Sequence, residues 1–273
     1  MNKLHVFTAD VDNTLRGKHS DRPGEKTLQA FEQMHKDGWL IGIESGRPLW
    51  QEMEDHHNQW GLSFQFDFII GLNGGELHDY LTDEIHTYNL LSVSSIKKIM
   101  DGIMPYGVNP FIYRDGYMLS LHDDEELRES SQRHHSETRL CKQISDMYEI
   151  PTAKVLIRTD HLKDSEAFEK YCLDNICDKN ITCFKTTPDM LEFQSPLNSK
   201  ATALDQFCKA HNISREEIIA FGDSENDIPM LKSAGTSVAL ENAMDEVKKE
   251  TDYTTEYCCD EDGVGKFLYS HIL

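Results

Sequence analysis

Positive charge is scarce in this chain of 273 residues, which has 27 lysines and arginines against 48 aspartates and glutamates and a formal net charge of −21. A surface of that sign repels nucleic acid, which we exclude as a partner. The chain also lacks an uninterrupted apolar run long enough to cross a bilayer, so no membrane partner is expected. Residues 1–4 lead straight into a predicted strand and leave no room for a signal peptide.

Cysteines in metal or redox spacing are absent as well. The seven cysteines are odd in number and form no Cys-x-x-Cys, which favours reduced thiols and a cytoplasmic protein. The pairs His56-His57 and His134-His135 lie in polar, helix-like stretches and are predicted to be solvated surface. With 38% hydrophobic and 27% charged residues, the composition is that of an ordinary globular chain. A monomer and a small homo-oligomer both remain open.

Short apolar runs near both ends of the chain each stop at polar residues. The runs cover residues 6–9, 39–43, 66–72, 218–221 and 236–240. Amphipathic stretches lie at 26–37, 201–211, 227–233 and 242–250. Asn242 is the expected N-cap of the last. This alternation predicts an α/β fold with a doubly wound, parallel, Rossmann-like sheet, whose ligands bind beyond the carboxyl ends of the strands. The polar residues expected there are Asp10, Asp12, Ser45, Asn73 and Asp223.

The middle of the chain has a different pattern. Helical stretches at 92–104 and 165–175 alternate with a hairpin at 111–120 and strands at 154–158, 181–186 and 191–195. Asp115-Gly116 is a typical hairpin turn. We therefore predict an inserted α+β cap domain at 83–188, between two core segments at 1–82 and 189–273.

Two carboxylates one residue apart end the first predicted strand. Side chains on a strand alternate with period two, so Asp10 and Asp12 lean the same way if the strand continues. Like charges this close repel, and a cation, a shared proton or chemistry must hold them. Asp223, at a second acidic strand end, supplies another hard oxygen ligand suited to Mg²⁺. One such strand end alone would be interpreted as a helix cap, whereas two in one sheet favour a metal site.

Two further segments suit phosphate. Ser45-Gly46-Arg47 offers a hydroxyl and backbone N–H groups at a turn, although Ser-Gly is often only a turn and Arg47 only a surface cation. Lys200 begins a predicted helix, where its charge opposes the helix dipole. That local cost suggests a use in neutralising phosphate or acidic ligands. An ordinary solvated lysine is the alternative interpretation.

These residues resemble the motifs of a known family. Residues 10–15, 45–47, Lys200 and 222–227 resemble, in order, the four motifs of the haloacid dehalogenase superfamily. Residues 73–75, 199–204, 242–248 and 260–264 are similar to its Cof-type phosphatases. The resemblance covers both core segments, and the middle matches only in size and α+β character. Asn13 stands where the family usually has glycine, and asparagine tolerates the left-handed backbone that the turn needs.

The resemblance implies a mechanism. Asp10 attacks phosphorus and becomes an aspartyl-phosphate, and Asp12 protonates the leaving alkoxide and then takes a proton from the hydrolytic water. As an acid Asp12 needs a raised pKa, and its acidic neighbour acts in that direction.

The resemblance also implies the binding groups. Mg²⁺ is held by the carboxylates of Asp10 and Asp223 and by the backbone carbonyl of Asp12. Ser45, Gly46, Lys200 and Asn226 hold the phosphate, and Asp227 lies behind the ligands and orients Lys200. Glu44 is unusual in an apolar strand and has no assigned role.

The expected function is a Mg²⁺-dependent phosphatase of small phosphomonoesters, such as sugar phosphates or phosphorylated cofactors, with the cap excluding water and reading the leaving group. Phosphotransfer to a sugar hydroxyl, as in mutases, is the close alternative. A phosphate-binding regulator without turnover is less favoured, and a response-regulator receiver does not fit the length. Four polar residues of the cap, Tyr113, Arg114, Lys154 and Arg158, could reach a leaving group but are favoured as ordinary strand-face residues.

Overall fold

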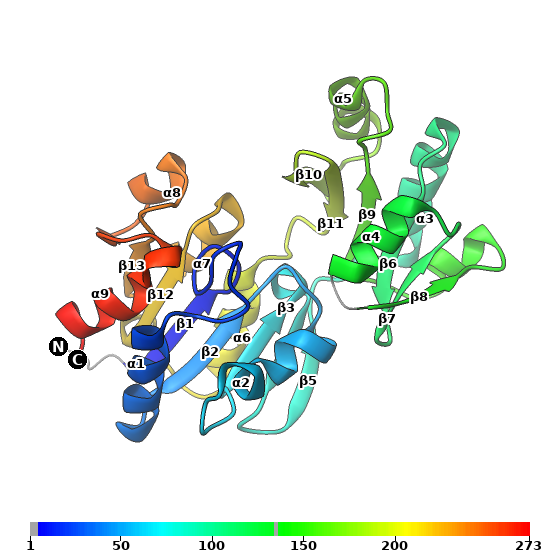
Figure 1. The fold of residues 1–273 in the computed structure, drawn as a ribbon. Helices are drawn as coiled ribbons and strands as arrows, with labels where there is room; N and C mark the ends of the chain where they lie inside the picture. The colour runs from blue at the N-terminus through cyan, green and yellow to red at the C-terminus, as the bar shows by residue number, and fades with distance from the viewer. Residues whose placement is uncertain (1–4, 134–135) are drawn as a thin grey trace. The chain divides into compact units, whose positions relative to one another are not determined.

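The computed structural model describes residues 5–133 and 136–273, so Leu4 and the pair His134-His135 lie outside the described residues. The chain divides into two units (Figure 1). The core unit comprises the described residues up to Leu49, Met53–His86 and Ser199–Leu273, and the second unit comprises Trp50–Glu52 and Thr87–Asn198. Among the described residues, no helix has both the length and the apolar character needed to cross a membrane.

The core unit contains an eight-stranded sheet in the order β14-β13-β12-β1-β2-β3-β4-β5. The strands are β1 Val6–Asp10, β2 Leu40–Glu44, β3 Phe68–Gly71, β4 Glu76–Asp79, β5 Glu84–Thr87, β12 Ile218–Gly222, β13 Thr236–Ala239 and β14 Tyr253–Thr254. From β14 to β3 all neighbours pair in parallel, as predicted, while β4 returns antiparallel to β3. The hairpin strands β4 and β5 were not anticipated.

Helices cover both faces of this sheet. They are α1 Glu25–Lys36, α2 Glu54–Trp60, α6 Lys200–Ala210, α7 Ile228–Ser233, α8 Asp245–Lys249 and α9 Gly263–His271. The alternation along β1 separates the faces: Phe7 joins the apolar cluster under α1 and α9, whereas Asp10 faces Lys200 at the start of α6. The predicted α/β class and the parallel, doubly covered core are therefore confirmed.

The second unit has a six-stranded sheet in the order β10-β11-β9-β6-β7-β8. Its strands are β6 Pro110–Arg114, β7 Tyr117–Ser120, β8 Glu137–Leu140, β9 Lys154–Arg158, β10 Thr182–Thr187 and β11 Met190–Gln194. Its helices are α3 Val93–Ile103, α4 Glu125–Arg133 and α5 Ser165–Asn175. Ser92 caps α3, and the hairpin turn at Asp115-Gly116 has positive φ at both residues, as its type requires.

Three expectations need correction. The second core segment was expected to begin at 189, but β11 pairs with β9 and β10, so the second unit extends to Asn198. Asn242 does not cap α8, which begins three residues later; its side chain instead bonds the backbone of Asn13 and Cys259. His56 is fully buried and stacks on Trp60, because the helix turns it inward.

Candidate functional site

The acidic strand ends meet in the core unit. Asp10 is the last residue of β1, and Asp223 follows β12, its parallel neighbour. Carboxylate oxygens of Asp10, Asp223 and Asp227 lie within 4.8 Å of one another, and all three residues are buried. Parallel strands end at the same edge of a sheet, which explains why segments more than 200 residues apart converge here.

Lys200 lies inside this acidic cluster. Its side chain is fully buried, and its ammonium donates to Asp10 Oδ1 and, at 2.5 Å, to Asp227 Oδ1. Ser199 caps α6 by accepting the Thr202 N–H at 3.2 Å, which places Lys200 in the first turn. Burial alone would lower the pKa of Lys200, but the surrounding carboxylates outweigh it and raise the pKa, so the lysine stays charged. The solvated-lysine interpretation is wrong.

Backbone packing also fixes the start of α6. Gly74, in the turn Leu72–Gly74 after β3, has φ +101°, and a Cβ there would lie 2.0 Å from the Ser199 carbonyl oxygen. Only glycine permits this approach of two main chains. The loop after β3 and the residue before Lys200 are thereby held together.

The cluster fits a divalent cation. Burial raises the pKa of Asp10 well above its usual value and that of Asp223 to about 6, with the neighbouring Asp227 adding to both. Three buried carboxylates gather around one ammonium, and a hard cation with oxygen ligands would relieve the repulsion. Asp10 and Asp223 suit direct coordination.

Both carboxylate oxygens of Asp227 already accept hydrogen bonds. Oδ1 accepts from Lys200, and Oδ2 accepts the backbone N–H groups of Asp223 at 2.9 Å and Ser224 at 3.0 Å. It therefore ties Lys200 to the loop that presents Asp223. Thr14 and Ser224 donate hydroxyl hydrogen bonds to Asp223 at 2.8 and 2.9 Å and orient that carboxylate in turn.

Asp12 lies apart from the other acids. Its side chain is 41% exposed and bonds Arg47 Nε at 2.8 Å and Arg16 Nε at 3.1 Å. Burial pushes its pKa up, but the two guanidinium groups outweigh burial and lower it. The expected raised pKa of Asp12 is therefore wrong for this conformation, and its side chain does not join the acidic cluster. Asn13 has φ 65°, as expected at this turn.

Sequence reasoning missed both arginine partners. Arg47 was weighed only as a surface cation, and Arg16 received no role. The signal available was weak: Arg16 follows Asp12 by four residues, and Arg47 is the charged end of the Ser-Gly-Arg turn. Their meeting depends on how two loops approach each other.

The second strand end brings a small polar network. Ser45 is buried and its Oγ accepts the Arg47 N–H at 3.1 Å, while its carbonyl accepts the Asn73 N–H at 3.1 Å. Asn226 donates to Asn73 Oδ1 at 3.2 Å. The side chain of Asn73 leaves only 3.1 Å for a Cβ at Gly46. Ser45, Gly46 and Asn226 are thus linked through Asn73.

Glu44 is completely buried on the α6 side of β2. Thr8, on the neighbouring strand, donates its hydroxyl to Glu44 Oε1 at 2.6 Å, and Oε2 has no hydrogen-bond partner. Burial raises the pKa of Glu44 to about 7, against the attraction of Lys200. Glu44 is therefore a further acidic group close enough to Lys200 to interact with its charge.

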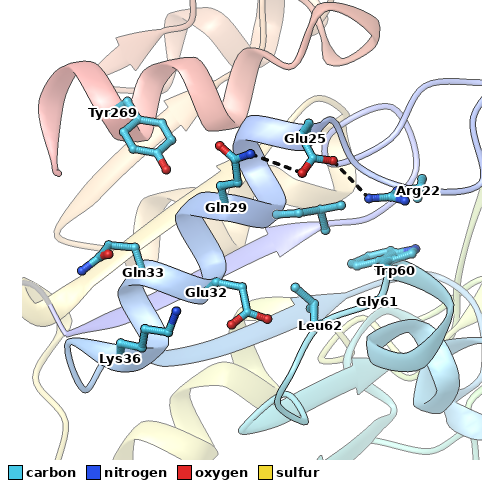
Figure 2. Close-up of a pocket in the computed structure, with 11 residues that line it drawn as sticks. Arg22, Glu25, Gln29, Glu32, Gln33, Lys36, Trp60, Gly61, Leu62 and Tyr269 are labelled. Carbon is cyan, nitrogen blue, oxygen red and sulfur yellow. Dashed lines mark hydrogen bonds and ion pairs between the residues drawn. The ribbon is translucent and has the colours of Figure 1, made fainter.

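A cavity of about 300 Å³ lies elsewhere on the core unit, along α1 (Figure 2). Its lining is mostly polar and includes Arg22, Glu25, Gln29, Trp60 and Tyr269. Arg22 and Gln29 both donate hydrogen bonds to Glu25, so the charges of Arg22 and Glu25 are paired with each other. None of the acidic cluster lines this cavity, so we do not treat it as the candidate site.

The chain belongs to the haloacid dehalogenase-like hydrolase family, whose model matches residues 7–268. The uracil-derivative phosphatase YitU of Bacillus subtilis (strain 168), named for 5-amino-6-(5-phospho-D-ribitylamino)uracil, is 27% identical over 272 residues and 97% of each chain. The pyridoxal phosphate phosphatase YbhA of Escherichia coli (strain K12) is 24% identical over 283 residues and 98% of each chain.

A solved structure has a similar fold. The crystal structure of TM0651 from Thermotoga maritima matches with a TM-score of 0.87 and 25% identity, over 99% of this chain and 98% of that one. The predicted superfamily and the hydrolase class are therefore confirmed.

Proposed function

We propose that this chain is a Mg²⁺-dependent phosphatase that hydrolyses small-molecule phosphomonoesters through an aspartyl-phosphate on Asp10. The observation that carries the proposal is the buried cluster of Asp10, Asp223 and Asp227 around the Lys200 ammonium. Excess negative charge at the end of a buried strand favours a cation and an anionic ester over a purely structural role.

The residues divide the chemistry among them. The Asp10 oxygen that is not bonded to Lys200 attacks phosphorus, which splits a difficult hydrolysis into two displacements. Lys200 and the Ser45-Gly46 turn hold the phosphoryl oxygens, with Asn226 at the rim. A bound Mg²⁺, held by Asp10, Asp223 and the Asp12 carbonyl, would screen the charges of nucleophile and ester.

Asp12 has two roles that require different protonation states. Its pairing with Arg47 and Arg16 favours the ionised form, which suits removal of a proton from the attacking water. We infer that Arg47 must release Asp12 before this carboxyl can protonate a leaving alkoxide.

The substrate class rests on the relatives. Both named above are phosphatases of a small ring compound that bears a phosphate. We propose sugar phosphates or phosphorylated cofactors as substrates, and a cytoplasmic location in keeping with the seven free cysteines.

The test is phosphate release from a panel of phosphorylated metabolites, with Mg²⁺ and with excess chelator. Borohydride reduction during turnover, followed by peptide mass spectrometry, should locate the trapped acyl-phosphate at position 10. Predominant transfer of phosphate to an acceptor sugar would replace hydrolysis by phosphotransfer. Inertness toward the whole panel, with phosphate binding retained, would favour the regulator.

A further inference from the structure

The turn after β1 folds back and brings Arg16 beside Asp12. The Asn13 N–H bonds the Arg16 carbonyl at 2.7 Å, and the Arg16 N–H bonds the Val11 carbonyl at 3.1 Å. Asp12 and Arg16 pair as an isolated β-bridge across this turn. Asn13, at φ 65°, supplies the left-handed backbone that the reversal needs. Main-chain hydrogen bonds therefore set the position of Arg16 relative to Asp12.

The Arg16 side chain is also held at its far end. Its Nη1 donates to the Asp21 carbonyl at 3.2 Å, and the indole N–H of Trp60, which is almost completely buried, donates to the same carbonyl at 3.1 Å. The Arg16 side chain is 7% exposed, against 21% for that of Arg47. Because both ends of Arg16 are bonded and the side chain is buried, its guanidinium has few other rotamers to adopt.

The two arginines bind the Asp12 carboxylate differently. Arg16 Nε donates to Oδ1 at 3.1 Å. Arg47 donates to Oδ2 from Nε at 2.8 Å and to Oδ1 from Nη2 at 3.3 Å. Arg47 belongs to the turn at 45–47, which the proposed function assigns to the phosphoryl group. A substrate anion that draws Arg47 away would take the Arg47 bond from Oδ2 and leave Oδ1 bonded to Arg16.

We propose that Arg16 is a positioning residue for Asp12, which holds Oδ1 through both displacements while Arg47 exchanges Oδ2 for the substrate. The role rests on the proposed phosphatase function and deepens it. Arg16 acts through Asp12, because it fixes the direction in which Oδ2 points toward the proton that is to be moved.

Oδ2 takes part in both displacements. In the first, an Asp10 oxygen bonds to phosphorus, the bond between phosphorus and the ester oxygen breaks, and the leaving alkoxide takes a proton from Asp12 Oδ2. In the second, a water oxygen bonds to phosphorus, the bond between phosphorus and Asp10 breaks, and one water proton passes to Oδ2. Asp10 recovers its carboxylate, Asp12 recovers its proton, and inorganic phosphate leaves.

The experiment separates these two displacements with para-nitrophenyl phosphate and Mg²⁺. Nitrophenolate leaves without a proton, so the second displacement alone requires Asp12. In Arg16→Met, rapid-quench measurements should show phosphoenzyme forming within about twofold of the unchanged rate. Its decay should slow on the order of 10–100-fold, because Oδ2 is no longer aimed at the water. A purely structural loss would reduce the number of active chains and leave this decay constant unchanged.

Two further variants complete the kinetic test. Arg22→Met is the matched control, because Arg22 lies in the same unit, is 51% exposed and pairs with Glu25, and its phosphoenzyme should decay like that of the unchanged chain. Arg16→Lys keeps a cation beside Asp12 and should decay faster than Arg16→Met. An unchanged decay constant in Arg16→Met would overturn the proposal, as would equal slowing in Arg22→Met.

A second measurement uses the natural sequence and does not require a variant to fold. The arginine Nε–H signals of the ¹⁵N-labelled chain report on their hydrogen-bond acceptors. Inorganic phosphate added with Mg²⁺ should shift the Arg47 signal and leave that of Arg16 in place. Equal shifts of both signals would overturn the proposal, and so would an Arg47 signal that does not move.

The outcomes also distinguish this role from the proposed function. An unchanged chain that forms no phosphoenzyme would overturn the proposed function and the role of Arg16 with it. An unchanged chain that forms phosphoenzyme, with the same decay constant in Arg16→Met, would overturn the role of Arg16 alone.

Discussion

Each unit buries a lysine, and the two lysines have different surroundings. In the second unit, Lys154 on β9 pairs with Glu192 on β11 at 3.1 Å, and both side chains are almost fully buried. In the core unit, Lys200 lies among Asp10, Asp227 and, more remotely, Glu44. A buried ion pair across two strands is typical of a structural role, whereas an excess of acidic groups around one cation indicates a ligand-binding site.

Among these substitutions, Asp10→Asn should have the largest effect, and the effect should be on the rate of phosphate release. The amide keeps the shape of the carboxylate but is not a nucleophile, so phosphate release should fall on the order of 10³-fold or more. The circular dichroism spectrum and melting temperature should stay close to those of the unchanged chain. Asp205→Asn, an exposed carboxylate on α6, is the control and should retain full activity. A wild-type rate in Asp10→Asn would remove Asp10 as the nucleophile.

Lys200→Met should affect both activity and stability. It removes the proposed phosphate-binding ammonium. It also leaves Asp10 and Asp227 buried without their cation, which should cost about 3–5 kcal/mol of unfolding free energy. Urea unfolding and steady-state kinetics measure the two losses. Lys209→Met, on the exposed side of the same helix, should change neither. If both variants behave alike, Lys200 is not part of the site.

Lys154→Met should cost stability of similar size, about 3–5 kcal/mol, because it removes the cation that pairs with the buried Glu192 carboxylate. The difference from Lys200 appears in the double variant Lys154→Met, Glu192→Leu. An apolar replacement of a structural ion pair should recover most of the loss in urea unfolding. No recovery would mean that Lys154 has a role beyond this pair.

Glu44→Gln should give the smallest effect, and it should depend on pH. Because burial raises the folded-state pKa to about 7, the stability contributed by protonated Glu44 is fully present below its ordinary value and is lost as pH rises through about 7. The glutamine is always neutral and keeps an acceptor for Thr8. Unfolding in chelator-treated buffer should therefore show little difference at pH 4.5 and a stabilisation of up to about 3 kcal/mol at pH 8. A constant difference across this range would contradict a titrating Glu44.

The sequence predicted the meeting of Asp10 and Asp223, since strand ends in a parallel sheet follow from local patterns and from order along the chain. The family resemblance, and not the sheet geometry, placed Lys200 with them. The sequence could not predict the partners of Asp12. Its pairing with Arg47 depends on the approach of two loops, which no periodicity encodes, and that pairing reverses the expected direction of its pKa.

Glu44 and His56 show the same limit. Glu44 had no assigned role, because the Thr8 hydroxyl that donates a hydrogen bond to it belongs to another strand. The residues around His56 are mostly polar, so composition alone could not predict that His56 is buried and stacks on Trp60.

The contact at Gly74 has a consequence for how this site can vary. The main chain that carries Lys200 lies against the main chain of Gly74, with no side chain between them. Even one added methyl at position 74 would displace the first turn of α6. A substitution at Gly74 is thus expected to disturb Lys200 through the main chain, by moving Ser199 and the start of the helix that follows it.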